Sequence, residues 1–348
     1  MRRLLYGGTV VNVFTGELER ADVLIENDKI IGVGDYFSEE ADVREDISGK
    51  YVCPGFIDGH IHIESTMLTP AELARLCLPK GTTSVVADPH EIANVCGVDG
   101  IKYMMEASAG IPLNVYFALP SCVPASPFDE SGAILEAEDI EPLFDHPAVV
   151  GLAEMMNYPG VLFDDAKVLK KLAAAKKHSK VIDGHAPFLV GKPLDKYVAA
   201  GICSDHECCN LDEAKEKIRK GQHVMIRQGT AARNLDDLLP LFDPPFNHRC
   251  LLVTDDRHPA DLMSEGHIDN IVRLAAKKGK SVITAIKMAT VQAAEYFRIP
   301  YLGAVAPGYR ADLLVLSDLE GVDVVDVYSR GEKVVDNKCT KRIAQPKV

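Results

Sequence analysis

An α/β fold, consisting of a (β/α)8 barrel and a small discontinuous β-sandwich, is predicted by three features of this 348-residue sequence. Strand-like and helix-like segments alternate through the middle of the chain, a pattern that favours a parallel sheet. Short β-rich segments lie at both ends. Apolar residues make up 47% of the chain, which allows a large core, and a single barrel typically takes ~250 residues.

The first 50 residues predict a small antiparallel sheet rather than the start of a barrel. They contain short β-rich segments that are separated by turn residues. Asn27-Asp28 lies between two of these segments and is a hairpin signal. The segments are residues 4–6, 9–13, 21–25 and 29–33.

Residues 53–302 are predicted to form the barrel. Its first strand contains Phe56 and Ile57 and leads to His60 and His62. Seven further strand-like segments follow, at residues 83–88, 113–119, 149–154, 181–185, 201–206, 223–228 and 251–255. Helical patterns lie between many of them, for example at residues 71–78, 97–107, 166–177 and 212–219. Eight strands that alternate with helices indicate a parallel barrel.

The end of the chain resembles its beginning. After Gly303, β-rich segments return at residues 311–316, 322–328 and 333–335. Each terminal group is too small to bury a core by itself. We therefore expect residues 1–52 and 303–337 to pair into one composite domain. The remaining segment, residues 338–348, is polar and is expected to be disordered.

Charge and composition argue against two classes of partner. The net charge of -13 disfavours nucleic acid, because phosphate binding needs clustered lysines and arginines. No apolar run approaches the ~18 residues of a membrane span, and the first residues are too short in apolar length for a signal peptide. The nine cysteines form no Cys-x-x-Cys pair, which favours reduced thiols. We expect a cytoplasmic protein that forms homo-oligomers.

The strand ends carry the candidate site, because chemistry in such barrels lies at the carboxyl ends of the strands. His60 and His62 are two residues apart, so both point to one face of the first strand. Later strands deliver single ionisable groups at the same end. The set of candidate ligands is His60, His62, Glu154, His185, His206 and Asp255.

Each of these six residues also has a structural interpretation. Asp255 could cap the following helix, Glu154 could belong to a buried ion pair, and single histidines often end strands. Six such residues on one rim are not explained in this way. Imidazole and carboxylate groups suit several divalent metals, so the sequence predicts a metal centre.

The number of ligands favours two divalent ions. The first two histidines would hold one ion and the later two the other, with Glu154 between them as the bridge. A water between the ions would lose a proton near neutral pH and give a hydroxide nucleophile. Asp255 could ligate one ion, accept that proton and pass it to a leaving group. Glu154 and Asp255 are therefore the candidate catalytic residues.

Four stretches of the sequence resemble the amidohydrolase superfamily and, within it, the adenine deaminases of bacteria and archaea. They are DGHIHIES at residues 58–65, ADPHEIAN at 87–94, GTAARNL at 229–235 and TDD at 254–256. The resemblance extends from the first β segment to about residue 336. The glutamate at position 154 is also informative, because many other members of the superfamily bridge their metals with a carboxylated lysine at this position.

The resemblance implies hydrolytic deamination of adenine to hypoxanthine and ammonia, a step of purine salvage and adenine catabolism. It implies two divalent ions per chain, Mn2+ first, with Fe2+ or Zn2+ as alternatives. A small purine would be the partner, and its edges need paired donors and acceptors. Candidates for contacts with the purine or with the ligands are Glu64, His90, Glu207, Arg227 and Gln228.

The sequence differs from the family pattern in two respects, and two other functions are compatible with the same residues. Adenine deaminases of this kind usually carry a further C-terminal domain, which we expect this chain to lack, and a glutamate where Gln228 stands. One alternative is a cyclic-amide hydrolase of the dihydropyrimidinase or hydantoinase type, which would have a lysine in place of Glu154. The other alternative is a catalytically silent scaffold with the same fold.

Overall fold

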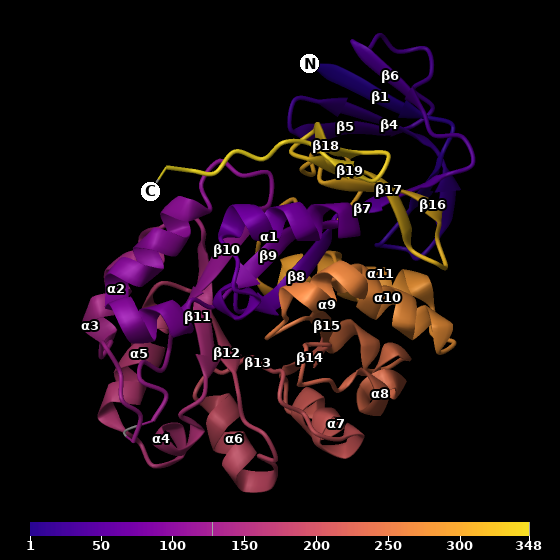
Figure 1. Ribbon diagram of the computed structural model, residues 1–348. Helices are drawn as coiled ribbons and strands as arrows, with labels where there is room; N and C mark the ends of the chain where they lie inside the picture. The colour runs from indigo at the N-terminus through magenta and orange to yellow at the C-terminus, as the bar shows by residue number, and fades with distance from the viewer. Residues whose placement is uncertain (127, 348) are drawn as a thin grey trace.

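The computed structural model describes residues 1–126 and 128–347 and confirms the predicted fold class. A barrel of eight parallel strands lies beside two sheets that the ends of the chain build together (Figure 1). In the described part of the chain, no helix combines the length and the apolarity that a membrane span requires.

The barrel contains all eight predicted strands in sequence order. Five of them form a parallel sheet in the order β12-β11-β10-β9-β8, and three form a second parallel sheet in the order β13-β14-β15. An isolated bridge between Ile61 and Asp255 joins the first strand to the last. The strands are β8 (Phe56–Ile61), β9 (Thr82–Ala87), β10 (Asn114–Leu119), β11 (Val149–Met155), β12 (Val181–Gly184), β13 (Ser204–Asp205), β14 (His223–Arg227) and β15 (Cys250–Val253).

Burial explains the apolar character of the strands. Every residue of β8 and β9 is buried, because helices cover the outer face of a parallel barrel and side chains fill its interior. The helices form an outer layer around the strands (Figure 1). They are α1 (Pro70–Cys77), α2 (His90–Ala107), α3 (Ala137–Ile140), α4 (Tyr158–Leu162), α5 (Ala166–Lys177), α6 (Gly191–Ala199), α7 (Leu211–Arg219), α8 (Leu235–Leu238), α9 (Pro259–Ser264), α10 (Ile268–Lys277), α11 (Val282–Met288) and α12 (Val291–Tyr296).

Helix α2 differs most from the sequence-based expectation, because it begins at His90 rather than at Gly97. Gly97 has φ 60° and ψ -143° and kinks the helix. Glycine tolerates this conformation, whereas other residues rarely adopt it. The kink interrupts the apolar period, so the sequence pattern gives only the second half of the helix. The described residues also contain five short 3-10 helices: η1 (Glu64–Thr66), η2 (Leu78–Lys80), η3 (Glu141–Asp145), η4 (Leu239–Phe242) and η5 (Asn247–Arg249).

The two terminal segments build two sheets together. One has the order β5-β4-β1-β6, and the other has the order β19-β18-β17-β16-β7-β2-β3. In the second sheet, β7 from the start of the chain pairs with β16 from its end. The strands are β1 (Arg2–Tyr6), β2 (Thr9–Val11), β3 (Leu18–Arg20), β4 (Asp22–Glu26), β5 (Lys29–Gly34), β6 (Val43–Asp46), β7 (Tyr51–Pro54), β16 (Leu313–Asp318), β17 (Asp323–Ser329), β18 (Glu332–Asp336) and β19 (Cys339–Thr340).

Buried side chains from both ends of the chain fill the space between these sheets. They include Leu5, Val23 and Ile30 from the first 50 residues and Leu313 and Val315 from the last strands. Burial of apolar area is the main force that holds such a composite core together. The predicted hairpin is also present, because β4 and β5 are antiparallel and their ends meet across Asn27-Asp28.

The polar segment at the end of the chain has defined contacts as far as the structure describes it. Strand β19 pairs with β18. Ile343 is buried, and its carbonyl accepts a hydrogen bond from Arg75 of α1 at 2.7 Å. The disorder expected for residues 338–348 stays a prediction, and Val348 lies outside the described residues.

Candidate metal centre

Five of the six predicted ligands are buried at the carboxyl ends of the barrel strands, and His185 is partly buried there. His60 and His62 lie at the end of β8, and Glu154 lies in β11. The other three directly follow a strand or lie within two residues of its end. Together they converge on one carboxylate, that of Glu154.

The two oxygens of Glu154 face different pairs of histidines. Oε1 lies 3.3 Å from Nε2 of His62 and 3.9 Å from Nε2 of His60. Oε2 lies 2.6 Å from Nδ1 of His185 and 3.2 Å from Nε2 of His206. Glu154 therefore stands between the two histidine pairs that the sequence suggested.

Asp255 adds a second carboxylate on the side of the first histidine pair. Its Oδ1 lies 3.2 Å from Nε2 of His62 and 3.8 Å from Nε2 of His60. The backbone of Asp255 has φ 60°, a left-handed conformation that is uncommon for residues other than glycine. Its N–H donates to the carbonyl of His60 at 2.9 Å. This bond holds the end of β15 against the end of β8.

The donor atoms fit a divalent cation. Nε2 of His60 is buried and has no hydrogen-bond partner among the described residues, although such atoms are normally paired. Burial, and then His206 and His62, hold the pKa of His60 well below its usual value. Histidine contacts, those of His206 and His185 foremost, hold the pKa of Glu154 low despite its burial. For His60 and Glu154 these shifts favour a neutral imidazole and an ionised carboxylate, the forms that bind metals. Neighbouring carboxylates instead raise the pKa of His62 and of His206 despite their burial.

Backbone and side-chain contacts orient these ligands from behind. Nδ1 of His62 lies 3.0 Å from the carbonyl oxygen of Asp88, which directs its Nε2 to the centre. The N–H of His185 donates to the hydroxyl of Tyr197 at 3.0 Å. The contact of Nδ1 fixes the rotation of the His62 ring, whereas the bond of His185 comes from its backbone N–H and holds the main chain at that ligand.

Two buried ionic clusters support the strand ends. Asp58 accepts from the N–H of His60 at 3.2 Å and from the N–H of Thr254 at 3.1 Å, and lies 3.0 Å from Nε2 of His267. This contact set ties β8 to β15. Beside the second histidine pair, the fully buried Lys217 of α7 donates to the carbonyl of Ala186, to Asp205 and to Glu213.

Three of the five predicted neighbours lie at the centre. Nδ1 of His90 is 3.0 Å from Asp88 and 3.7 Å from Oε1 of Glu154. Glu207 lies 3.6 Å from both His185 and His206. The guanidinium of Arg227 donates to both oxygens of Glu207, at 2.5 and 2.7 Å, and to Asp255.

The other two predicted neighbours, Glu64 and Gln228, have buried atoms without partners. Oε1 of Glu64 accepts from the N–H of Ile92 at 3.1 Å. Among the described residues, Oε2 of Glu64 and Oε1 of Gln228 have no hydrogen-bond partner. Neither residue belongs to a group of potential metal ligands there. Buried oxygens of this kind are available to accept hydrogen bonds from a ligand.

Three residues of the site were not among the sequence-predicted set. Asp88 groups with His62, His90 and Glu154; its position at the end of β9 was the available signal. Asp58 was not predicted, because Asp58 followed by Gly59 has the composition of an ordinary turn. Lys217 gave no signal, because it lies among other lysines in a polar helix.

A barrel with histidines and carboxylates gathered at the carboxyl ends of its strands defines a metal-dependent enzyme architecture. The sequence model of the amidohydrolase family matches residues 51–334. The chain therefore belongs to the amidohydrolase family.

Curated relatives agree with this assignment. The chain is 49% identical over 336 residues to an adenine deaminase of Desulfatibacillum aliphaticivorans, covering 97% of this chain and 58% of the relative. It is 50% identical over 333 residues to an adenine deaminase of Clostridium acetobutylicum, covering 95% and 58%. The chain thus spans somewhat more than half the length of these relatives.

Solved structures show the same fold at low identity. A β-aspartyl dipeptidase of Fervidobacterium islandicum AW-1 has a TM-score of 0.74 at 16% identity, with 99% of each chain covered. A dihydropyrimidinase of Brevibacillus agri has a TM-score of 0.72 at 18% identity, with 98% of this chain and 96% of that chain covered.

Proposed function

We propose that the protein hydrolyses adenine to hypoxanthine and ammonia. The observation that carries the proposal is the convergence of six metal-binding groups on one rim, in a chain that shares about half of its residues with curated adenine deaminases. The reaction adds water at the ring carbon that bears the amino group and releases that group as ammonia.

The proposed metal content is two divalent ions, Mn2+ first, with Fe2+ or Zn2+ as alternatives. One ion would be held by His60, His62 and Asp255, and the other by His185 and His206. Glu154 would be shared, because its two oxygens face the two histidine pairs. Divalent ions held there would act as Lewis acids and lower the pKa of water.

Asp255 is the proposed proton carrier. Its carboxylate lies at the end of β15, against His62 and within hydrogen-bonding reach of Arg227. Hydrogen bonding from His62, and the charges of His206 and His60, lower the pKa of Asp255 although burial raises it. An ionised Asp255 can take a proton from the attacking water and return it to the departing amino nitrogen. Arg227 would hold the carboxylate in position for both transfers.

Purine recognition is assigned to the side chains with buried, unpartnered oxygens. Glu64 and Gln228 each present one such atom among the described residues, and His90 lies beside the first histidine pair. The ring N–H groups of a purine need acceptors of this kind, and a mismatched edge would be costly. Glu207 supports the centre by holding Arg227.

The test is ammonia release from adenine by protein reconstituted with Mn2+, with the Asp255→Asn variant as the control. We expect ammonia from the parent and at least a ~100-fold slower release from the variant, which is the lower range for loss of a general acid–base group. Dihydrouracil is assayed in parallel. Ring opening of dihydrouracil without ammonia from adenine would favour a cyclic-amide hydrolase, and a protein that binds no metal and turns over neither compound would be a scaffold.

Self-association, a cytoplasmic location and a role in purine salvage remain predictions beside this proposal. Light scattering of the purified chain tests the first. Fractionation of cells that express the protein tests the second. Growth on adenine as the purine source, with and without the gene, tests the third.

A further inference from the structure

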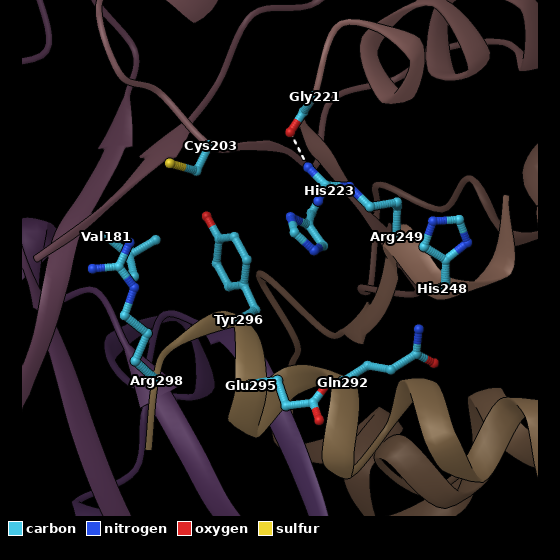
Figure 2. A pocket seen from close by; sticks show the side chains of 10 residues that line it. All are labelled: Val181, Cys203, Gly221, His223, His248, Arg249, Gln292, Glu295, Tyr296 and Arg298. Atoms are coloured by element: carbon cyan, nitrogen blue, oxygen red, sulfur yellow. Dashed lines mark hydrogen bonds between the residues drawn. The ribbon is translucent and has the colours of Figure 1, made fainter. Parts of the chain in front are cut away.

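A second cavity lies at the opposite end of the barrel from the metal centre. It has a volume of about 290 Å³ and opens at the amino ends of β12, β13, β14 and β15 (Figure 2). Its lining comes from residues that begin these strands or directly precede them, together with the last turn of α12. The charged and aromatic side chains of the lining are those of His223, His248, Arg249, Glu295, Tyr296 and Arg298.

The charges of this lining are unusual in a chain with a net charge of -13. The lining contains two guanidiniums, those of Arg249 and Arg298, and one carboxylate, that of Glu295. In the described part of the chain neither guanidinium forms an ion pair, whereas Arg227 and Arg257 do. The cavity therefore carries a surplus of positive charge.

Hydrogen bonds to backbone carbonyls hold the two arginines in place. Arg249 donates to the carbonyl of Gly221 (Figure 2). Arg298 donates to the carbonyl of Ser179 at 3.1 Å. Each bond engages one terminal nitrogen of a guanidinium that has five N–H donors. The remaining donors are available to an anion.

The aromatic groups form the wall between the arginines. The rings of His223 and Tyr296 meet edge to face, with centroids 4.8 Å apart. The hydroxyl of Tyr296 donates to Asp183 at 2.6 Å, so the tyrosine offers its ring rather than its hydroxyl. Figure 2 shows Arg249 and His248 on one side of this pair and Arg298 on the other.

The pKa of His223 is sensitive to the positive charge of the cavity. Burial, and then the charges of Arg249 and His248, lower its pKa to about 4. The backbone of Cys203 acts on the ring in the opposite direction, through a hydrogen bond that raises the pKa. An anion in the cavity would be attracted by the same guanidinium charge that disfavours protonation of His223.

We propose that this cavity binds the phosphate group of a small molecule, either inorganic phosphate or a sugar phosphate. Guanidinium groups match the geometry of phosphate oxygens and bind them through paired hydrogen bonds. The volume is close to the lower limit of ~300 Å³ for small-molecule sites, which suits a phosphate that carries a small organic group. The site shares no residue with the metal centre.

Calorimetric titration of the metal-loaded full chain tests the proposal, with inorganic phosphate and ribose 5-phosphate as separate probes. We expect saturable binding of at least one probe. Equal affinities would identify phosphate alone as the ligand, and tighter binding of ribose 5-phosphate would identify an organic phosphate. The double variant Arg249→Gln/Arg298→Gln should weaken binding roughly tenfold or more, as expected for lost hydrogen bonds to a charged group.

Two further variants keep the test decisive. Arg298→Glu changes an exposed side chain, so the fold should persist while the repulsive charge abolishes binding. Arg20→Gln, on the exposed strand β3, is the matched control and should bind as the parent does. The proposal is overturned if neither probe binds saturably. It is equally overturned if the variants at Arg249 and Arg298 leave binding unchanged. Loss of binding on chelation of the metal would then place the anion at the metal centre.

Discussion

At the scale of single residues, Glu154 determines the organisation of the centre. Its side chain contacts five histidines: His60, His62 and His90 through Oε1, and His185 and His206 through Oε2. No other carboxylate among the described residues has this arrangement. A carboxylate in this position both neutralises bound cations and separates the two histidine pairs.

Replacement of Glu154 by glutamine should therefore remove metal binding while the fold persists. The amide is neutral, and its nitrogen would face a histidine pair without a lone pair to donate. We expect at least a ~100-fold loss of Mn2+ affinity, the upper range for residues that only support a metal ligand. Elemental analysis after dialysis measures the metal content. Glu138→Gln, at an exposed glutamate paired with Lys170, should retain the metal of the parent.

His223 gives a prediction about pH. Its pKa is lowered to about 4 in the folded protein, whereas a histidine in an unfolded chain titrates near ~6.5. The unfolded chain therefore binds more protons between these values, so stability is highest above pH ~6.5 and falls as the pH drops towards 4. His223→Gln removes this contribution.

The measurement is the free energy of unfolding in urea at about pH 7 and about pH 5. The loss between these conditions should be smaller in His223→Gln than in the parent. His258→Gln, at an exposed histidine, should lose as much stability as the parent does. A parent and a His223 variant with the same pH dependence would contradict the assignment.

At the scale of secondary structure elements, helix α7 stabilises two strand ends through one side chain. Lys217 is fully buried and contacts Asp205 and Glu213 at 2.7 Å each. Asp205 ends β13, directly before His206, and also accepts from the N–H of Ala186, directly after His185. The helix thus fixes the relative position of the second histidine pair.

Lys217→Met should destabilise the protein by about 3–5 kcal/mol, because it leaves two buried carboxylates without their cation. Urea unfolding monitored by circular dichroism measures this change. The control is Lys170→Met on the exposed face of α5, which should change stability by no more than ~0.5 kcal/mol. If both variants unfold at the same urea concentration, the buried cluster does not support the strand ends.

The same elements show how far the sequence could be interpreted. The strands are predictable because burial on both faces makes them apolar and their ends carry His60, Glu154 or Asp255. Asp255 rather than Asp256 reaches the centre, and it lies two residues after the end of β15. The role of Lys217 is not predictable, because its partners Asp205 and Glu213 come together only after β12, β13 and α7 have packed.

At the scale of the whole molecule, a single residue, Gly55, connects the composite sheets to the start of the barrel. Strand β7 ends at Pro54 and β8 begins at Phe56. A Cβ atom at Gly55 would lie 2.1 Å from the hydroxyl of Thr83, so glycine is required at this close approach. The strand that carries His60 and His62 is therefore anchored in the pairing of both chain ends.

Gly55→Ala should consequently disturb the centre from a distance. The clash with Thr83 must shift β8 or β9, and both strands end at the metal site. We expect a lower melting temperature and a lower Mn2+ content than in the parent. Unchanged values for both would show that the connection between the sheets and the barrel is not rigid.

The central claim is that the two histidine pairs and Glu154 form a two-metal centre that deaminates adenine. Its most direct test is the rate of ammonia release from adenine as the metal-free chain is titrated with Mn2+. The account predicts that the rate rises with added metal and reaches its plateau at two equivalents per chain. A plateau at one equivalent would contradict the two-metal centre, and no ammonia at any metal content would contradict the proposed reaction.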